Sequence, residues 1–311
     1  MGRSGWVTGM VGVVGAMVGL GACGSTPRGG AGEREGGLAF GWSLPARANV
    51  VERVELPGGA VELAYAIELV REGDGYRLRH TSAEVKEADG IVVGYDDRKK
   101  AQARTAYRVM DLTDIELDQD LQVTRCVESP ILRAYVSTLV DALEKGPRAA
   151  YEIQFREASE AAVAAQGCIA RWQSWVLAWV GFVAKPGTPD RWSPEGESAI
   201  GEEPKIRVVD THEGESPEGP GLVRLTRHQE IDAEVLTGDV SELAADLSKD
   251  LGAPVAATRV TIDGATHEGL ADLDERTLEP RRVAWTSEIR YALDGLSKVR
   301  VTRKSWTFRF Q

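Results

Sequence analysis

The chain has 311 residues, with 37 basic and 48 acidic side chains that give a formal net charge of −11. Hydrophobic residues make up 42% of the chain, which is enough to build a buried core and excludes a largely disordered protein. The acidic balance disfavours binding to a phosphate backbone, which needs concentrated lysine and arginine, so we expect no nucleic-acid partner.

Residues 1–22 have the pattern of an export signal. Arg3 is their only charged residue, an apolar run extends from Val7 to Leu20, and small residues precede Cys23. A cationic start, a short apolar core and small residues before a cleavage point are typical of a secretory signal peptide. The run is too short and too rich in glycine for a membrane span. We therefore expect residues 1–22 to be absent from the mature protein.

The tetrad Leu20-Gly21-Ala22-Cys23 resembles the lipobox of bacterial lipoproteins. The resemblance implies that Cys23 receives diacylglycerol and becomes the first residue after cleavage, so that acyl chains anchor the protein to a membrane. Gly24, rather than aspartate, follows the cysteine, and by the sorting rule of enteric lipoproteins this implies the outer membrane, facing the periplasm. The alternative is a plain secretory signal with an incidental cysteine.

The mature chain is expected to begin with a tether. Residues 23–45 are rich in glycine, proline and polar residues, which predicts a flexible segment without structure of its own. Residues 46–311 are expected to form a single domain.

Two cysteines remain once Cys23 is assigned to the lipid. Cys126 and Cys168 are an even pair in an oxidising compartment, which favours a disulfide. Two separately buried thiols are the alternative. A redox pair is disfavoured because neither cysteine lies in a Cys-x-x-Cys motif.

Alternation of apolar and polar residues predicts most of the strands. The first clear strand pair is a hairpin whose turn is Glu72–Gly75. The last clear strand pair is joined at Asp294-Gly295, and a bulge is predicted near Arg303-Lys304 in its second strand. The segments with this pattern are 61–69, 76–80, 115–123, 151–155, 206–209, 222–231, 255–262 and 283–293.

Three segments have helical spacing. Ser129-Pro130 is a favourable helix start before an apolar stripe that ends at Gly146, and predicts a helix over 129–143. Further helices are predicted over 170–183 and 240–251. Strands, central helices and strands again predict an α+β fold, in which helices cover one face of a curved antiparallel sheet.

The order of these elements resembles that of uncharacterised bacterial envelope lipoproteins. The shared features are an early strand pair, the Ser-Pro-capped helix over 129–143, a tryptophan-bearing middle and late strands around Asp272-Leu273-Asp274. The resemblance implies a fold akin to the open half-barrel of lipoprotein carriers.

No common catalytic or metal-binding framework is recognisable. His212 and His267 each begin a His-Glu pair without a second histidine four residues on, so they lack the zinc-protease spacing, and we expect exposed histidines and no metal or cofactor. The acidic residues between Asp111 and Asp120 lack the glycine turn of a calcium loop and alternate with apolar residues. This alternation favours the solvated face of a strand.

The tryptophans at helical spacing suggest a second kind of site. Trp172, Trp175 and Trp179 would share one helix face, where they pack as core, line a hydrophobic ligand cavity or lie at the bilayer interface. We favour the core interpretation. The leading hypothesis is a lipid-anchored, non-enzymatic envelope protein that binds a hydrophobic ligand or an envelope protein partner, and the alternative is a periplasmic hydrolase with an unrecognised active site.

Overall fold

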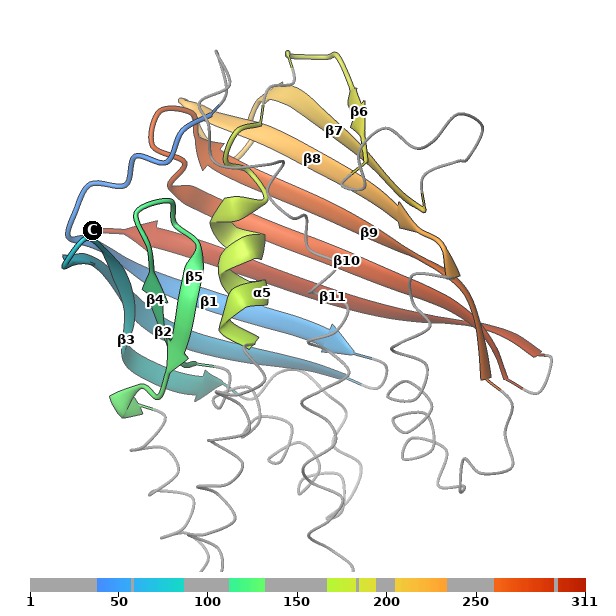
Figure 1. Cartoon of the computed structure of the whole chain (residues 1–311), viewed down its shortest axis with the longest axis horizontal. Helices are drawn as coiled ribbons and strands as arrows, with labels where there is room; N and C mark the ends of the chain where they lie inside the picture. The colour runs from blue at the N-terminus through green and yellow to red at the C-terminus, as the bar shows by residue number, and fades with distance from the viewer. Residues whose placement is uncertain are drawn as a thin grey trace, which may run out of the picture. The chain divides into compact units, whose positions relative to one another are not determined.

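The computed structural model describes residues 38–56, 59–86, 112–131, 167–182, 185–193, 205–233, 260–293 and 296–311 (Figure 1). The strands are β1 (Ala46–Leu56), β2 (Gly59–Glu72), β3 (Gly75–Lys86), β4 (Asp114–Leu117), β5 (Val123–Val127), β6 (Asp190–Trp192), β7 (Ile206–Glu215), β8 (Leu222–Ile231), β9 (Val260–Asp274), β10 (Pro280–Leu293) and β11 (Leu296–Phe310). A short helix, α5 (Gly167–Trp172), continues into a π-helical turn, η2 (Gln173–Leu177).

The eleven strands belong to one sheet, in the order β5-β4-β3-β2-β1-β11-β10-β9-β8-β7-β6. The predicted α+β class is therefore wrong, because the described part of the chain is nearly all β and its named helical elements are α5 and η2. The helix predicted over 170–183 is shorter than expected, because regular α-helix ends at Trp172 and the π-helical turn ends at Leu177. Most of the helix predicted over 129–143, and all of that over 240–251, lie outside the described residues, as does the strand predicted over 151–155.

The described chain forms two compact units. Unit 1 holds the described residues within 38–41, 55–56 and 174–305, and unit 2 holds those within 42–54, 59–173 and 306–311. Unit 1 thus contains β6 to β10 and most of β11. Unit 2 contains β2 to β5, most of β1, the end of β11 and α5.

Unit 1 is built from antiparallel strand pairs, and burial alternates without interruption along β8. The strand predicted over 222–231 is confirmed as β8, where every second side chain is buried. Alternate residues of a strand point to opposite faces, so along β8 one face of the sheet is buried and the other is more exposed. The buried face, which we call the inner face, positions the groups described below.

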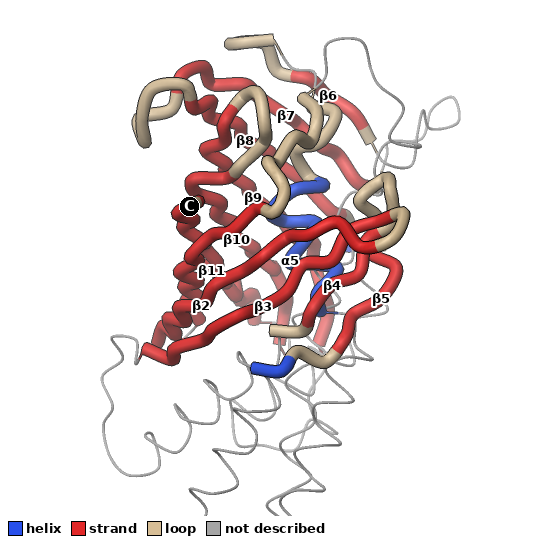
Figure 2. Tube along the Cα trace, turned by 90° about the vertical axis from the view of Figure 1, so that its left-hand side faces the viewer, coloured by secondary structure: helices blue, strands red, loops and turns tan. Residues whose placement is uncertain are grey.

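Unit 2 contains a hairpin that the sequence pattern did not reveal. The single strand predicted over 115–123 is wrong, because β4 and β5 pair with each other across a turn (Figure 2). In this turn Asp118 N donates to Gln122 O over 3.0 Å, Gln122 N donates to Asp118 Oδ1 over 2.8 Å, and Leu121 has a φ of 63°. The apolar residues before and after the turn continue the alternation expected of one uninterrupted strand, so the alternation alone cannot reveal the turn.

Part of the predicted tether is packed. In unit 2, Trp42 is 5% exposed and its ring lies 5.9 Å from that of Trp172 and 5.0 Å from that of Phe310. In unit 1, Leu38 N donates to Phe182 O over 3.2 Å. These contacts involve the last residues of the predicted tether, and residues 23–37 lie outside the described part.

Candidate functional site

A row of residues crosses the inner face of unit 1 from β7 to β10. The strand registers place Asp210 opposite Arg227, Arg227 opposite Gly269, and Gly269 opposite Trp285. Directly paired residues share one face of a sheet, so these four positions form a continuous band. Together with Trp179 and Trp192 we call this band the Arg227 cluster.

Arg227 is a buried cation whose charge is fully compensated. Its Nε lies 2.7 Å from Asp210 Oδ1 and its Nη2 lies 2.8 Å from Asp210 Oδ2, which is a two-pronged ion pair. Its Cζ lies 5.8 Å from the ring centre of Trp179 and 5.4 Å from that of Trp192, within cation–π range. Trp192 Nε1 also donates to Asp210 Oδ2 over 3.0 Å. The pair therefore holds β6, β7 and β8 together and leaves no charge for an ionic ligand.

Trp285 lies flat against the backbone of β9. A Cβ atom at Gly269 would lie 2.7 Å from the indole ring, so this position has no room for a side chain. The rings of Trp285 and Trp179 are 5.7 Å apart, and Trp179 Nε1 donates to Ser174 O over 3.0 Å. The turn that follows η2 thus brings the side chain of Trp179 onto the sheet.

An apolar cluster adjoins this band on the same face. Its buried members are Ile206, Val208, Ile231, Ala265, Ile289 and Tyr291. Trp192 and Ile262 pack against it while only partly buried, and Trp285 is also partly buried. The inner face of unit 1 therefore has solvent-accessible apolar surface next to a cluster of buried apolar side chains.

A histidine and a serine lie between the two clusters. Ser287 Oγ is 2.9 Å from His267 Nδ1, while His267 Nε2 is buried without a hydrogen-bond partner in the described part of the chain. Burial, and then the charge of Lys304, lowers the pKa of His267 to about 4. An imidazole with that pKa is a weak base at neutral pH, and no carboxylate among the described residues orients it. The pair gives no support to the hydrolase hypothesis.

The buried His267 predicts a specific acid sensitivity. An unfolded histidine has a pKa of about 6.5, so between pH 6.5 and 4 the unfolded chain binds a proton that the folded chain does not. Stability from the neutral imidazole is complete above pH 6.5 and falls by about 3 kcal/mol as the pH approaches 4. We expect His267→Gln to lose less stability than the wild type over this range, measured by denaturant unfolding. Equal slopes for His267→Gln and the wild type would contradict the assignment.

Unit 2 contains a second set of buried polar groups, supplied by α5, β1 and β2. Tyr65 OH donates to Glu52 Oε2 over 3.1 Å, and Arg171 Nη2 lies 3.7 Å from the same oxygen. All three residues are at most 6% exposed. Burial and then the charge of Glu52 raise the pKa of Tyr65 well above its usual value, so the phenol stays protonated and serves as a donor.

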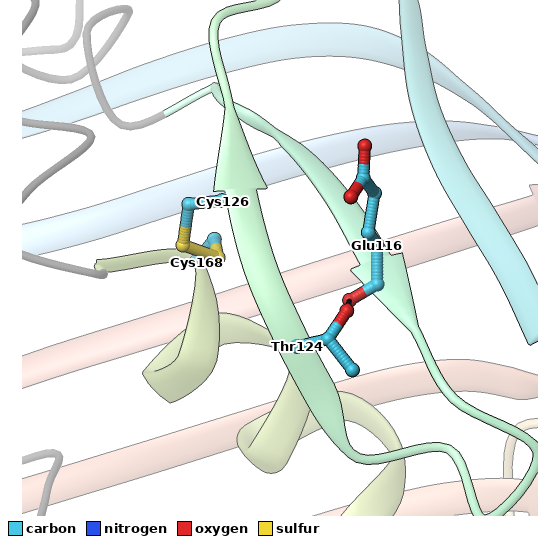
Figure 3. The surroundings of a disulfide bond; sticks show 4 residues. All are labelled: Glu116, Thr124, Cys126 and Cys168. Carbon is cyan, nitrogen blue, oxygen red and sulfur yellow. Dashed lines mark hydrogen bonds between the residues drawn. A yellow bond between two sulfur atoms is a disulfide. The ribbon is translucent and has the colours of Figure 1, made fainter.

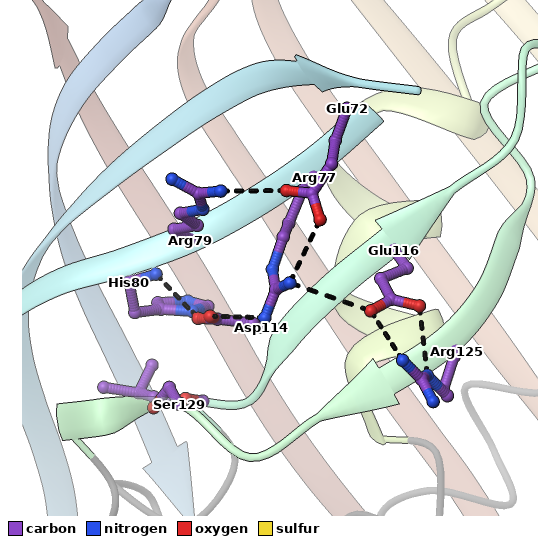
Figure 4. A network of polar contacts seen from close by, with 9 residues as sticks. Glu72, Arg77, Arg79, His80, Asp114, Glu116, Arg125 and Ser129 are labelled. Atoms are coloured by element: carbon purple, nitrogen blue, oxygen red, sulfur yellow. Dashed lines mark hydrogen bonds and ion pairs between the residues drawn. The ribbon is translucent and has the colours of Figure 1, made fainter. Parts of the chain in front are cut away.

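His80 and Asp114 extend this polar set to β3 and β4 (Figure 4). His80 N donates to Asp114 Oδ1 over 2.9 Å, and Arg77 Nη2 lies 3.7 Å from Asp114 Oδ2. Burial lowers the pKa of His80. The expectations that the histidines and the acidic stretch are exposed are therefore wrong for His80, His267 and Asp114, while Glu116 is partly exposed and pairs with Arg125 at 2.8 Å. Opposite charges balance here, which indicates a structural network.

The disulfide predicted between Cys126 and Cys168 is present, with its Cα atoms 6.0 Å apart (Figure 3). It joins β5 to the first turn of α5, the helix that carries Arg171 and Trp172. The bond thereby fixes a very short helix that could not be stable alone.

Removing the disulfide should destabilise unit 2. Cys126→Ala with Cys168→Ala is expected to lower the free energy of unfolding by about 2 to 4 kcal/mol, because the reduced chain gains freedom when unfolded. Denaturant unfolding of the non-reduced proteins measures this difference. Unchanged stability, or alkylation of free Cys126 and Cys168 in the wild type, would contradict the bond.

The three tryptophans singled out by their spacing are divided between the two units. Trp172 belongs to unit 2 and donates from Nε1 to Leu121 O over 2.9 Å, whereas Trp175 and Trp179 belong to unit 1. All three are fully buried, as the core interpretation predicts. Sequence reasoning missed Arg227, although this residue occupies one of the alternating buried positions of β8, and it expected His267 to be exposed.

Comparisons with known proteins identify no family. No family model matches the chain, and no curated protein matches it. Among solved structures, the chain is similar to one described as "Lipid-protein interactions in lipovitellin", with a TM-score of 0.36 and 6% sequence identity. The match covers 86% of this chain and 25% of that chain, so this chain spans about a quarter of its length.

Two further observations concern the described residues alone. They contain no group of three or more histidine, cysteine, aspartate or glutamate side chains placed to hold a metal ion. Within the same ranges, no helix has the length and apolar character needed to cross a membrane. Cys23 lies outside these ranges.

Proposed function

We propose that the protein is a lipid-anchored, non-enzymatic protein of the bacterial envelope whose unit 1 binds a hydrophobic ligand. The observation that carries the proposal is the accessible apolar surface of Trp192, Ile262 and Trp285, which continues a buried apolar cluster on the inner face. Sites for small hydrophobic molecules are lined in this way, with few polar groups.

The anchor part of the proposal depends on the lipobox-like tetrad that ends at Cys23, together with the absence of aspartate at position 24. The protein would then be held at the outer membrane by diacylglycerol and face the periplasm. In this proposal the protein binds rather than catalyses, and an envelope protein partner is the other occupant that the same apolar side chains could accept.

The ligand is tested with N-phenylnaphthylamine, an uncharged apolar probe whose fluorescence rises on binding. We expect the full chain to bind the probe, and Ile262→Glu to weaken binding at least about tenfold, because a charge would enter the apolar surface. Leu44→Glu alters an exposed apolar residue in unit 2 and should leave binding unchanged. The absence of both probe binding and co-purified lipid would overturn the ligand proposal, and a co-purified envelope protein would replace it.

The anchor is tested by Cys23→Ala. This variant should lack the diacylglycerol mass and accumulate as uncleaved precursor or unlipidated protein, whereas Ser25→Ala should be processed normally. Mass spectrometry and partitioning into detergent measure both. A Cys23→Ala protein with unchanged mass and partitioning would disprove the anchor.

A further inference from the structure

The start of β11 is exposed on both faces of the sheet. Leu296, Ser297, Lys298 and Val299 are all exposed, although consecutive strand residues point to opposite sides. Leu296 is 69% exposed and Val299 is 56% exposed. They are two of the three large apolar side chains that the described residues leave exposed. Figure 1 shows this segment at one end of the β10 and β11 strand pair.

The charge of this strand is opposite to that of the whole protein. Residues 296–311 contain five basic side chains and no acidic one, in a chain with a net charge of −11. Arg303 is partly compensated by Glu55, whose Oε2 lies 3.9 Å from its Nη1. Lys298 makes no ion pair with any described residue and lies between the two exposed apolar side chains.

We propose that Leu296, Lys298 and Val299 form a docking surface for a bilayer that contains anionic phospholipid. Exposed apolar side chains enter the boundary between headgroups and acyl chains, and nearby cations are attracted to the lipid phosphates. A nucleic-acid occupant is disfavoured because residues 296–305 contain no aromatic ring on which bases could stack. The surface does not depend on the proposed acyl anchor, although an anchor would keep it within reach of the membrane.

The test uses the full-length chain with Cys23→Ala, so that no acyl chain contributes, and flotation with phospholipid vesicles. We expect stronger binding to vesicles of phosphatidylcholine mixed with phosphatidylglycerol than to phosphatidylcholine alone, and weaker binding at high salt. Lys298→Glu should reduce binding to the anionic vesicles about tenfold, and so should Leu296→Ser with Val299→Ser.

Matched controls separate this surface from general effects. Lys185→Glu makes the same change of net charge at another exposed position of unit 1, and Leu44→Ser removes the third exposed apolar side chain. Both should bind as the parent does. Equal binding by parent and Lys298→Glu, or no preference for anionic vesicles, would overturn the docking surface. It would leave the apolar ligand and the Cys23 anchor untouched, since those are measured separately.

Discussion

Replacing Arg227 by leucine is expected to lower the free energy of unfolding by about 3 to 5 kcal/mol. The substitution leaves Asp210 5% exposed with Trp192 Nε1 still donating to it but with no cation. A buried carboxylate without a counterion is costly because water can no longer solvate it. Denaturant unfolding at neutral pH measures the loss.

The same two strands provide the control for this prediction. Arg207 and Glu230 are also paired between β7 and β8, with Nε 3.1 Å from Oε2, but they lie on the exposed face. Arg207→Leu should therefore cost at most about 1 kcal/mol. Arg227→Leu combined with Asp210→Leu should recover much of the single variant's loss. Equal losses for Arg207→Leu and Arg227→Leu would show that burial of the charge pair has no energetic consequence.

Replacing Trp175 by alanine is expected to destabilise the protein by about 3 to 5 kcal/mol. Trp175 lies in the π-helical turn and its side chain is 0% exposed. Removing a fully buried indole forfeits its apolar burial and leaves a cavity that the surroundings fill only in part. The midpoint and slope of denaturant unfolding measure the effect.

Two further variants show whether burial is the cause. Leu296→Ala removes an apolar side chain that is 69% exposed and should change stability by no more than about 0.5 kcal/mol. Trp175→Phe keeps an aromatic ring and should lose less than Trp175→Ala. An unchanged midpoint for Trp175→Ala would refute the core role that spacing and burial both assign to this residue.

Alternation of apolar and polar residues predicted the strands well wherever one face of the sheet is buried and the other is exposed to solvent. The predicted bounds of β8 are those observed, because Val223 to Ile231 alternates without interruption. Alternation failed to predict the turn at Leu121, because the apolar residues on both sides of this turn continue the same alternating pattern. The α+β class was wrong because the spacing of Trp172, Trp175 and Trp179 fits a helix, whereas the residues are shared between α5, η2 and a turn.

The groups of the candidate site were harder to predict, for a physical reason. A sequence shows that Arg227 has the parity of an apolar face, but not that Asp210 lies opposite it, since the partner depends on the register of β7 against β8. The burial of Asp114 is equally hidden, because it depends on His80 and Arg77 some 34 and 37 positions away. The disulfide was accessible from a count of cysteines, which needs no register.

Residues 306–311 close unit 2 against its first strand. Trp306 and Phe308 are buried there, Phe310 meets Trp42, and Gln311 N donates to Arg47 O over 3.0 Å. β1 lies between β2 and β11, and the contact of Arg47 with Gln311 joins residues some 264 positions apart, whereas β7 and β8 are neighbours along the chain. Contacts between distant residues cost more chain entropy to form than local hairpins do, so we expect β1 to pair with β11 later in folding than β7 pairs with β8.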